Sequence, residues 1–157
     1  VLYDKKKAVQ TQSYGSEVRG GAARSEVVIS NDPIDYPKLL YTDIFISMSQ
    51  QSTDKYANDV KVGGAVLIDP DMVPNPPTRK DVRVYAIPAT RIAEAQFQNR
   101  MAANALMLGA LAGLTNVVSS EALIQSIRRS VPKNTEELNL KAYKVGLDLV
   151  SSLKSST

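Results

Sequence analysis

The chain has 157 residues, a formal net charge of +3, 43% hydrophobic residues and 22% charged residues. This length suits one domain of ordinary size, which buries about 70% of its unfolded surface without a disulfide or metal staple. The sequence contains no Cys, no His and no Trp. Those absences exclude thiolate nucleophiles, cysteine-ligated iron–sulfur clusters, ordinary zinc sites and Ser-His-Asp triads. We therefore expect the chain to be non-catalytic by itself.

The basic residues do not form a pattern typical of nucleic-acid binding. Nucleic-acid-binding proteins gather Lys and Arg in a stripe interleaved with aromatic residues, whereas the one run here, Lys5-Lys6-Lys7, follows Asp4 and indicates a solvated turn. No apolar run approaches the roughly 20 residues that span a bilayer, and no signal-peptide pattern is present. We expect no nucleic-acid partner, no membrane association and a cytoplasmic location.

The first half of the chain predicts strands separated by loops. Strands are expected over residues 8–13, 24–30, 43–48, 65–69 and 82–87 because these segments are β-branched, apolar or alternating. The polar residues 49–59 have room for two or three helical turns, and the prolines of 70–77 indicate an irregular loop. Gly63-Gly64 is interpreted as the turn from this helix into the buried strand.

The second half is predicted to be helical. Thr90 is expected to cap a short helix that runs through Gln96. Ser119 and Ser120 are expected to cap a helix over 121–129, and Asn134 is expected to cap the last helix. The helix over 99–114 is apolar nearly all round and should be buried between layers. The last helix carries an apolar stripe of Leu138, Ala142, Val145 and Leu149.

This order of elements predicts an α/β fold. Strands that alternate with helices favour a mostly parallel sheet. We expect a three-layer Rossmann-like domain with a helical C-terminal part, formed as a single domain by residues 1–157.

A glycine-rich loop between the first two predicted strands carries the candidate binding residues. Its glycines permit positive φ or close backbone approach, and Arg19 offers a planar fork for a carboxylate or phosphate that Glu17 is placed to hold. The functional interpretation is a phosphate or subunit contact. From the residue pattern alone we favour a tight connection between two strands, because the loop matches neither a Walker A loop nor a GxGxxG fingerprint. The candidate residues are Tyr14, Gly15, Glu17, Arg19, Gly20 and Gly21.

Two further positions carry weaker hypotheses. Asp69 and Asp71 follow a buried strand, at the edge where α/β folds bind ligands. They could coordinate Mg²⁺ or cap the following turn, and we favour the cap, so no metal site is predicted. Asn104 lies on the buried helix, where an amide needs partners, and we expect it to bond a neighbouring loop.

Several motifs fall in an order that identifies a family resemblance. They are Tyr14–Ala22, Ser25-Glu26-Val27, Ile34–Pro37, Ile87–Thr90, Asn104 with Leu108-Gly109-Ala110, and Asn139 with Ala142 and Gly146. Together they resemble the gamma subunit of 2-oxoacid:ferredoxin oxidoreductases over nearly the whole chain. The approach from Val9 to Gly15 looks most like the 2-oxoglutarate branch.

Two departures from the family pattern stand out. Ser16 takes the place of a common Pro, which should leave the loop less rigid. The family opens with a strand and a Gly-x-Gly-Gly-Gln-Gly loop that have no counterpart here. We therefore expect the sequence to begin near the end of the first helix, without the first strand and most of that helix.

The resemblance implies a complex that converts 2-oxoglutarate and CoA to succinyl-CoA and CO₂, with electrons passed to ferredoxin or flavodoxin. In such complexes thiamine diphosphate and iron–sulfur clusters are held by other subunits. This chain would then bind no cofactor alone, have alpha, beta and delta-type subunits as partners, and contribute an interface with contacts on the side of the co-substrate CoA.

Two alternatives stay open. One is the gamma subunit of a pyruvate, branched-chain or aryl-pyruvate relative, which would share the fold and differ in substrate. The other is a stand-alone nucleotide-binding module, for which residues 14–21 are the one available phosphate loop.

Overall fold

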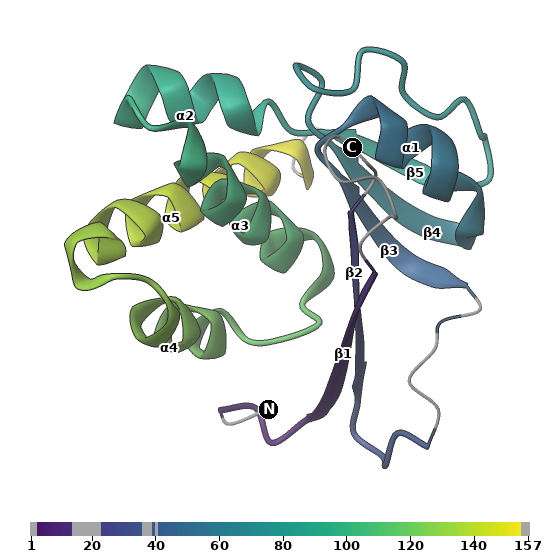
Figure 1. The fold of residues 1–157 in the computed structure, drawn as a ribbon, viewed down its shortest axis with the longest axis horizontal. Coiled ribbons are helices and arrows are strands. Elements are labelled where there is room, and N and C mark those ends of the chain that lie inside the picture. The colour runs from purple at the N-terminus through teal and green to yellow at the C-terminus, as the bar shows by residue number, and fades with distance from the viewer. Residues whose placement is uncertain (1–2, 14–22, 36–38, 40, 155–157) are drawn as a thin grey trace. The chain divides into compact units, whose positions relative to one another are not determined.

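A computed structural model describes residues 3–13, 23–35, 39 and 41–154 (Figure 1). The chain divides into two compact units, one formed mainly by residues 5–86 and the other by residues 2–4 with 87–157. Among the described helices, none is long and apolar enough to cross a membrane. The organisation of residues 1–157 as a single domain stays a prediction.

The first unit combines a hairpin with a parallel sheet. In chain order its described elements are β1 (Lys7–Ser13), β2 (Arg24–Ser30), β3 (Thr42–Ser47), α1 (Gln50–Tyr56), the 3₁₀ helix η1 (Ala57–Asp59), β4 (Val60–Ile68) and β5 (Arg83–Ala86). Strands β1 and β2 pair antiparallel, from Lys7 opposite Ser30 to Ser13 opposite Arg24. Strands β3, β4 and β5 form a parallel sheet in that order. The predicted α/β fold is confirmed.

Strand β4 lies in the middle of the sheet, and its second half, residues 64–68, is buried on both faces. Val66 and Ile68 pack in a cluster with Val60, Val73 and Val82, while Leu67, which points to the opposite face, is also fully buried. A strand covered on both faces reads as a continuous apolar run rather than an alternation. The predicted buried strand over 65–69 is confirmed on this basis.

The prediction that Gly63-Gly64 forms the turn before this strand is wrong, because both glycines lie inside β4. The register with β3 is irregular here, since Thr42 pairs with Val60 and Ile44 with Ala65. Gly63 has a φ of +78°, in the left-handed region that favours glycine. The pair therefore lies where the register between β3 and β4 shifts, and the strand begins earlier than expected.

The proline-containing loop between β4 and β5 is anchored by Arg79. Its guanidinium contacts the Asp81 carboxylate at 2.6 and 3.0 Å and donates to the carbonyl oxygens of Ala57 and Asn58, each at 3.2 Å. The hydrogen bonds from Arg79 hold the pKa of Asp81 below its usual range. One arginine thus ties the end of the loop to η1.

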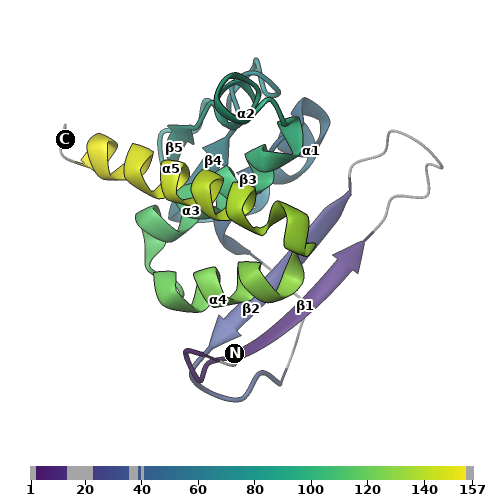
Figure 2. The same ribbon diagram turned by 90° about the vertical axis from the view of Figure 1, so that its left-hand side faces the viewer.

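The second unit is helical, as predicted (Figure 2). Its described elements are α2 (Ala89–Phe97), η2 (Arg100–Ala102), α3 (Ala103–Thr115), α4 (Ser120–Ser130), η3 (Lys133–Thr135) and α5 (Glu136–Lys154). Most residues of α3 are buried, which confirms the interpretation drawn from its apolar surface. Asn104 is an exception, because it is exposed, so the expectation that it is buried is wrong.

The predicted caps have mixed outcomes. Ser119 Oγ accepts a hydrogen bond from the backbone N–H of Ala122 at 3.1 Å and caps α4 as expected. Thr90 does not cap α2, because the helix begins at Ala89 and buries Thr90 in its first turn. Asn134 lies within η3, and α5 begins at Glu136.

Helices α3 and α5 pack with their backbones in close contact. A methyl group at Gly109 would overlap the carbonyl oxygen of Tyr143, and one at Gly146 would overlap that of Leu106. Because backbone oxygens cannot rotate away, neither position has room for a side chain. Each helix therefore contributes one glycine, and the two glycines set the distance between the helices.

We predict that Gly109→Ala lowers the free energy of unfolding by about 2 kcal/mol or more, because the methyl group would force the two backbones apart. Urea or thermal unfolding of the purified chain measures the loss. Gly113→Ala is the matched control. There the nearest atom to the new methyl group would be Leu147 Cδ1 at 3.2 Å, on a side chain that can move. Equal losses in both variants would contradict the account.

Candidate functional site

The candidate loop is the segment of the chain between strands β1 and β2. Its predicted site residues, Tyr14, Gly15, Glu17, Arg19, Gly20 and Gly21, all lie outside the described residues. The structure does describe the two strands that carry them, down to the pairing of Ser13 with Arg24. Segment 14–22 therefore joins two antiparallel strands, and its contact role stays a prediction.

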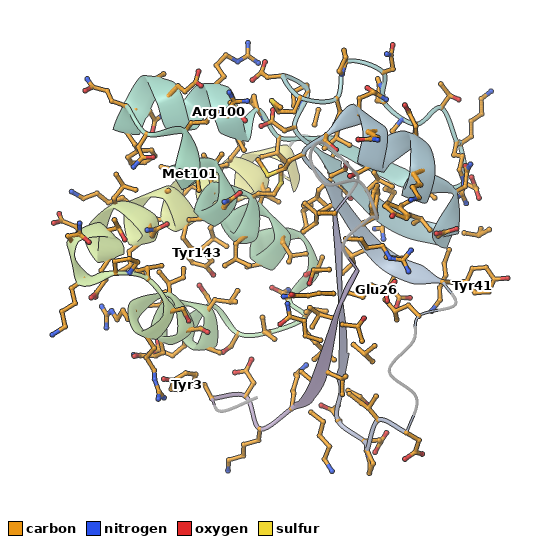
Figure 3. All side chains as sticks on the ribbon, in the orientation of Figure 1. Tyr3, Glu26, Tyr41, Arg100, Met101 and Tyr143 are labelled. Carbon is orange, nitrogen blue, oxygen red and sulfur yellow. The ribbon has the colours of Figure 1, made fainter. Side chains whose placement is uncertain are left out.

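A polar network lies on the half-buried face of this hairpin. Arg24 forms an ion pair with Glu26 on the same strand, and Glu26 also accepts a hydrogen bond from Thr11 Oγ1 at 3.1 Å (Figure 3). Residues two apart on a strand point to the same face. The pairing of Thr11 with Glu26 then brings the hydroxyl from β1 to the same place.

Arg24 also links the hairpin to the helical segment after β3. Its guanidinium carbon lies 4.9 Å from the centroid of the Tyr56 ring, and Nη1 lies 3.9 Å from Asp59 Oδ2. A guanidinium over an aromatic face is a favourable cation–π contact. The root of the candidate loop is thus anchored to α1 and η1 by a residue that sequence reasoning did not single out.

Asp69 directly follows β4, is fully buried and forms hydrogen bonds with backbone N–H groups. Its Oδ1 accepts the N–H of Asp71 at 3.1 Å, and its carbonyl oxygen accepts the N–H groups of Met72 and Val73 at 3.0 and 2.8 Å. Asp69 therefore caps the turn, the interpretation favoured from the sequence. In the described part of the chain, no three or more His, Cys, Asp or Glu side chains gather as a metal site would require.

Buried hydroxyl groups at the adjacent end of β3 were not anticipated. Thr53 Oγ1 on α1 donates to Ser47 Oγ at 2.9 Å and lies 3.0 Å from the carbonyl oxygen of Ser49. Ser49 caps α1 by accepting the N–H of Ser52 at 3.2 Å. These hydroxyls join β3 to α1 through satisfied hydrogen bonds, so they stabilise the sheet edge.

The sequence of the chain matches a known protein family. Residues 1–149 match the family described as pyruvate ferredoxin/flavodoxin oxidoreductase. The chain is 52% identical over 153 residues to the 2-oxoglutarate synthase subunit KorC of Methanocaldococcus jannaschii, covering 97% of this chain and 82% of that relative. The ketoisovalerate oxidoreductase subunit VorA of Methanothermobacter marburgensis is 32% identical, covering 87% of this chain and 29% of that relative.

A solved structure agrees with these sequence matches. The keto/oxoacid ferredoxin oxidoreductase gamma subunit from Geobacter sulfurreducens PCA superposes with a TM-score of 0.85 at 37% identity, covering 96% of this chain and 84% of that chain. The resemblance drawn from the order of motifs is confirmed. The chain belongs to the pyruvate ferredoxin/flavodoxin oxidoreductase family.

Proposed function

We propose that this chain is the gamma-type subunit of a 2-oxoglutarate:ferredoxin oxidoreductase, or of an enzyme that uses flavodoxin instead. The carrying observation is its 52% identity to a 2-oxoglutarate synthase subunit over 97% of this chain. The complex would convert 2-oxoglutarate and CoA to succinyl-CoA and CO₂. Identity falls to 32% for the ketoisovalerate relative, which favours 2-oxoglutarate as the substrate.

The residues of this chain do not fit an electron-carrying role. Iron–sulfur clusters require thiolate ligands, and the sequence has no cysteine. We therefore propose that alpha, beta and delta-type subunits hold the clusters and thiamine diphosphate. This chain would act as a structural subunit, one gamma-type domain over residues 1–157.

The proposed contribution to CoA binding is electrostatic. Arg19 can offer two parallel N–H donors to a phosphate or a carboxylate, the geometry in which guanidinium groups bind most strongly. Arg24 supports this role, because its contacts with Glu26, Tyr56 and Asp59 hold one end of the loop. We propose that Arg19 contacts CoA or a carboxylate of a partner subunit.

Purification from the native source tests membership of the complex. We expect the chain to co-elute with partner subunits, identified by mass spectrometry, and the fraction to reduce a low-potential dye in a reaction that requires both 2-oxoglutarate and CoA. Recovery as a lone monomer would contradict the proposal. So would activity with pyruvate or 2-ketoisovalerate and none with 2-oxoglutarate.

We predict that Arg19→Ala in the assembled complex raises the apparent KM for CoA about tenfold or weakens assembly, because a charge-assisted hydrogen bond to an anion is lost. Steady-state kinetics and size-exclusion chromatography measure the two effects. Arg100→Ala, which removes an exposed arginine 4.0 Å from Glu94, is the control and should change neither. Unchanged assembly and CoA kinetics in Arg19→Ala would rule out this role.

Arg24→Gln tests the positioning of the loop. We expect the KM for CoA to rise severalfold with little change in kcat, and amide exchange in β1 and β2 to become faster, because the contacts with Tyr56 and Asp59 are lost. Lys61→Gln, which breaks the exposed 2.8 Å ion pair with Asp43, serves as the control. If both variants behave like the wild type, Arg24 has no positioning role.

A further inference from the structure

The β1–β2 hairpin has one face that carries no charge. The register pairs Gln10 with Val27, and Gln10 Nε2 donates to Ser25 Oγ at 3.0 Å, so these side chains lie on the same side. The alternation of the strands adds their neighbours, and five of the six residues are exposed, Ile29 being half-buried. This outer face consists of Ala8, Gln10, Gln12, Ser25, Val27 and Ile29.

The charges near the hairpin are directed elsewhere. Arg24 and Glu26 lie on the opposite, half-buried face, where they pair with each other. Lys7, the first residue of β1, pairs with Ser30 and also lies on the face opposite the outer one. None of the six outer-face residues is charged. Charged side chains are depleted at the centre of protein–protein interfaces, so an uncharged face suits that position.

The hairpin also lacks the support that a larger sheet would give. In the part of the chain that the structure describes, β1 and β2 pair with each other and with no further strand. A two-stranded sheet is at best marginally stable in water unless something packs against it. Val27, in the middle of the outer face, is 52% exposed. A partner seated on this face would bury that apolar surface.

The relatives indicate which partner this is. In the ketoisovalerate oxidoreductase subunit VorA the matching region is 29% of a longer chain, whereas it makes up 82% of the KorC subunit. The same domain thus occurs joined to the greater part of a long chain and as a separate subunit. In both forms it needs a surface that contacts the remainder of the assembly.

We propose that the outer face docks on an uncharged surface of the partner subunit that corresponds to the remainder of the longer relative. This inference rests on the proposed function as a gamma-type subunit. Seven-residue strands at about 3.4 Å per residue give a face about 24 Å long. A standard interface buries about 800 Å² on each partner, so the outer face forms its centre and neighbouring residues complete it.

A charge placed on the outer face tests the proposal in the assembled complex. Val27→Lys should weaken association with the partner subunit about 30-fold or more, because the ammonium group would be desolvated without a counter-ion. Val27→Thr keeps a β-branched, uncharged side chain and should assemble nearly as well as the wild type. Val62→Lys places the same charge at a valine that is 80% exposed on β4 and should assemble normally.

The outcomes separate this proposal from the proposed function. Loss of co-elution and of 2-oxoglutarate-dependent dye reduction in Val27→Lys alone, with circular dichroism and Tm of the free chain unchanged, supports the docking surface. Normal assembly of Val27→Lys beside an active wild-type complex overturns the docking surface and leaves the function standing. Failure of the wild type to assemble overturns the function. A homodimer of the free chain that Val27→Lys dissociates would show that a second copy covers the face, which also overturns the proposal.

Discussion

The close packing of α3 against α5 is the constraint on which the second unit depends. Gly109 and Gly146 each face a carbonyl oxygen of the other helix, so the helices meet through their backbones over this stretch. That contact places Tyr143 against Ala112 and Ile127, and its hydroxyl lies 2.8 Å from Ser120 Oγ on α4 (Figure 3). The two glycines let α3 and α5 pack closely, and Tyr143 on α5 joins this pair to α4.

The first unit is organised differently, around satisfied polar groups. Asp69, Ser47 and Thr53 are buried, yet each bonds to a backbone group or a neighbouring hydroxyl and ties a strand end to the following segment. Buried polar groups with partners stabilise a structure, whereas groups kept unpaired for chemistry would cost free energy. In the first unit these buried polar groups therefore serve to hold strand ends in place.

Local sequence signals predicted most of the elements but few of the contacts between them. Apolar and β-branched runs predict β2 over the residues observed. Of the two serines predicted to cap α4, Ser119 is the cap and Ser120 is the first residue of the helix. The prediction for Gly63-Gly64 is wrong because these glycines lie at a shift in the register with β3, which no local stretch of sequence reveals. Gly109 and Gly146 were quoted as family motifs, yet their role is visible only when α3 and α5 lie together. Arg24 was missed for the same reason, since Tyr56 lies 32 positions further along the chain.

We propose that this chain presents the β1–β2 hairpin to the rest of an oxidoreductase complex. Hydrogen–deuterium exchange on the free chain and on the assembled complex tests it most directly, because burial slows the exchange of backbone amides. We expect slower exchange in the complex for peptides covering residues 7–13 and 24–30, with little change around Val62. Unchanged exchange over residues 7–13 and 24–30, beside protection elsewhere on the chain, would rule out the hairpin as the contact surface.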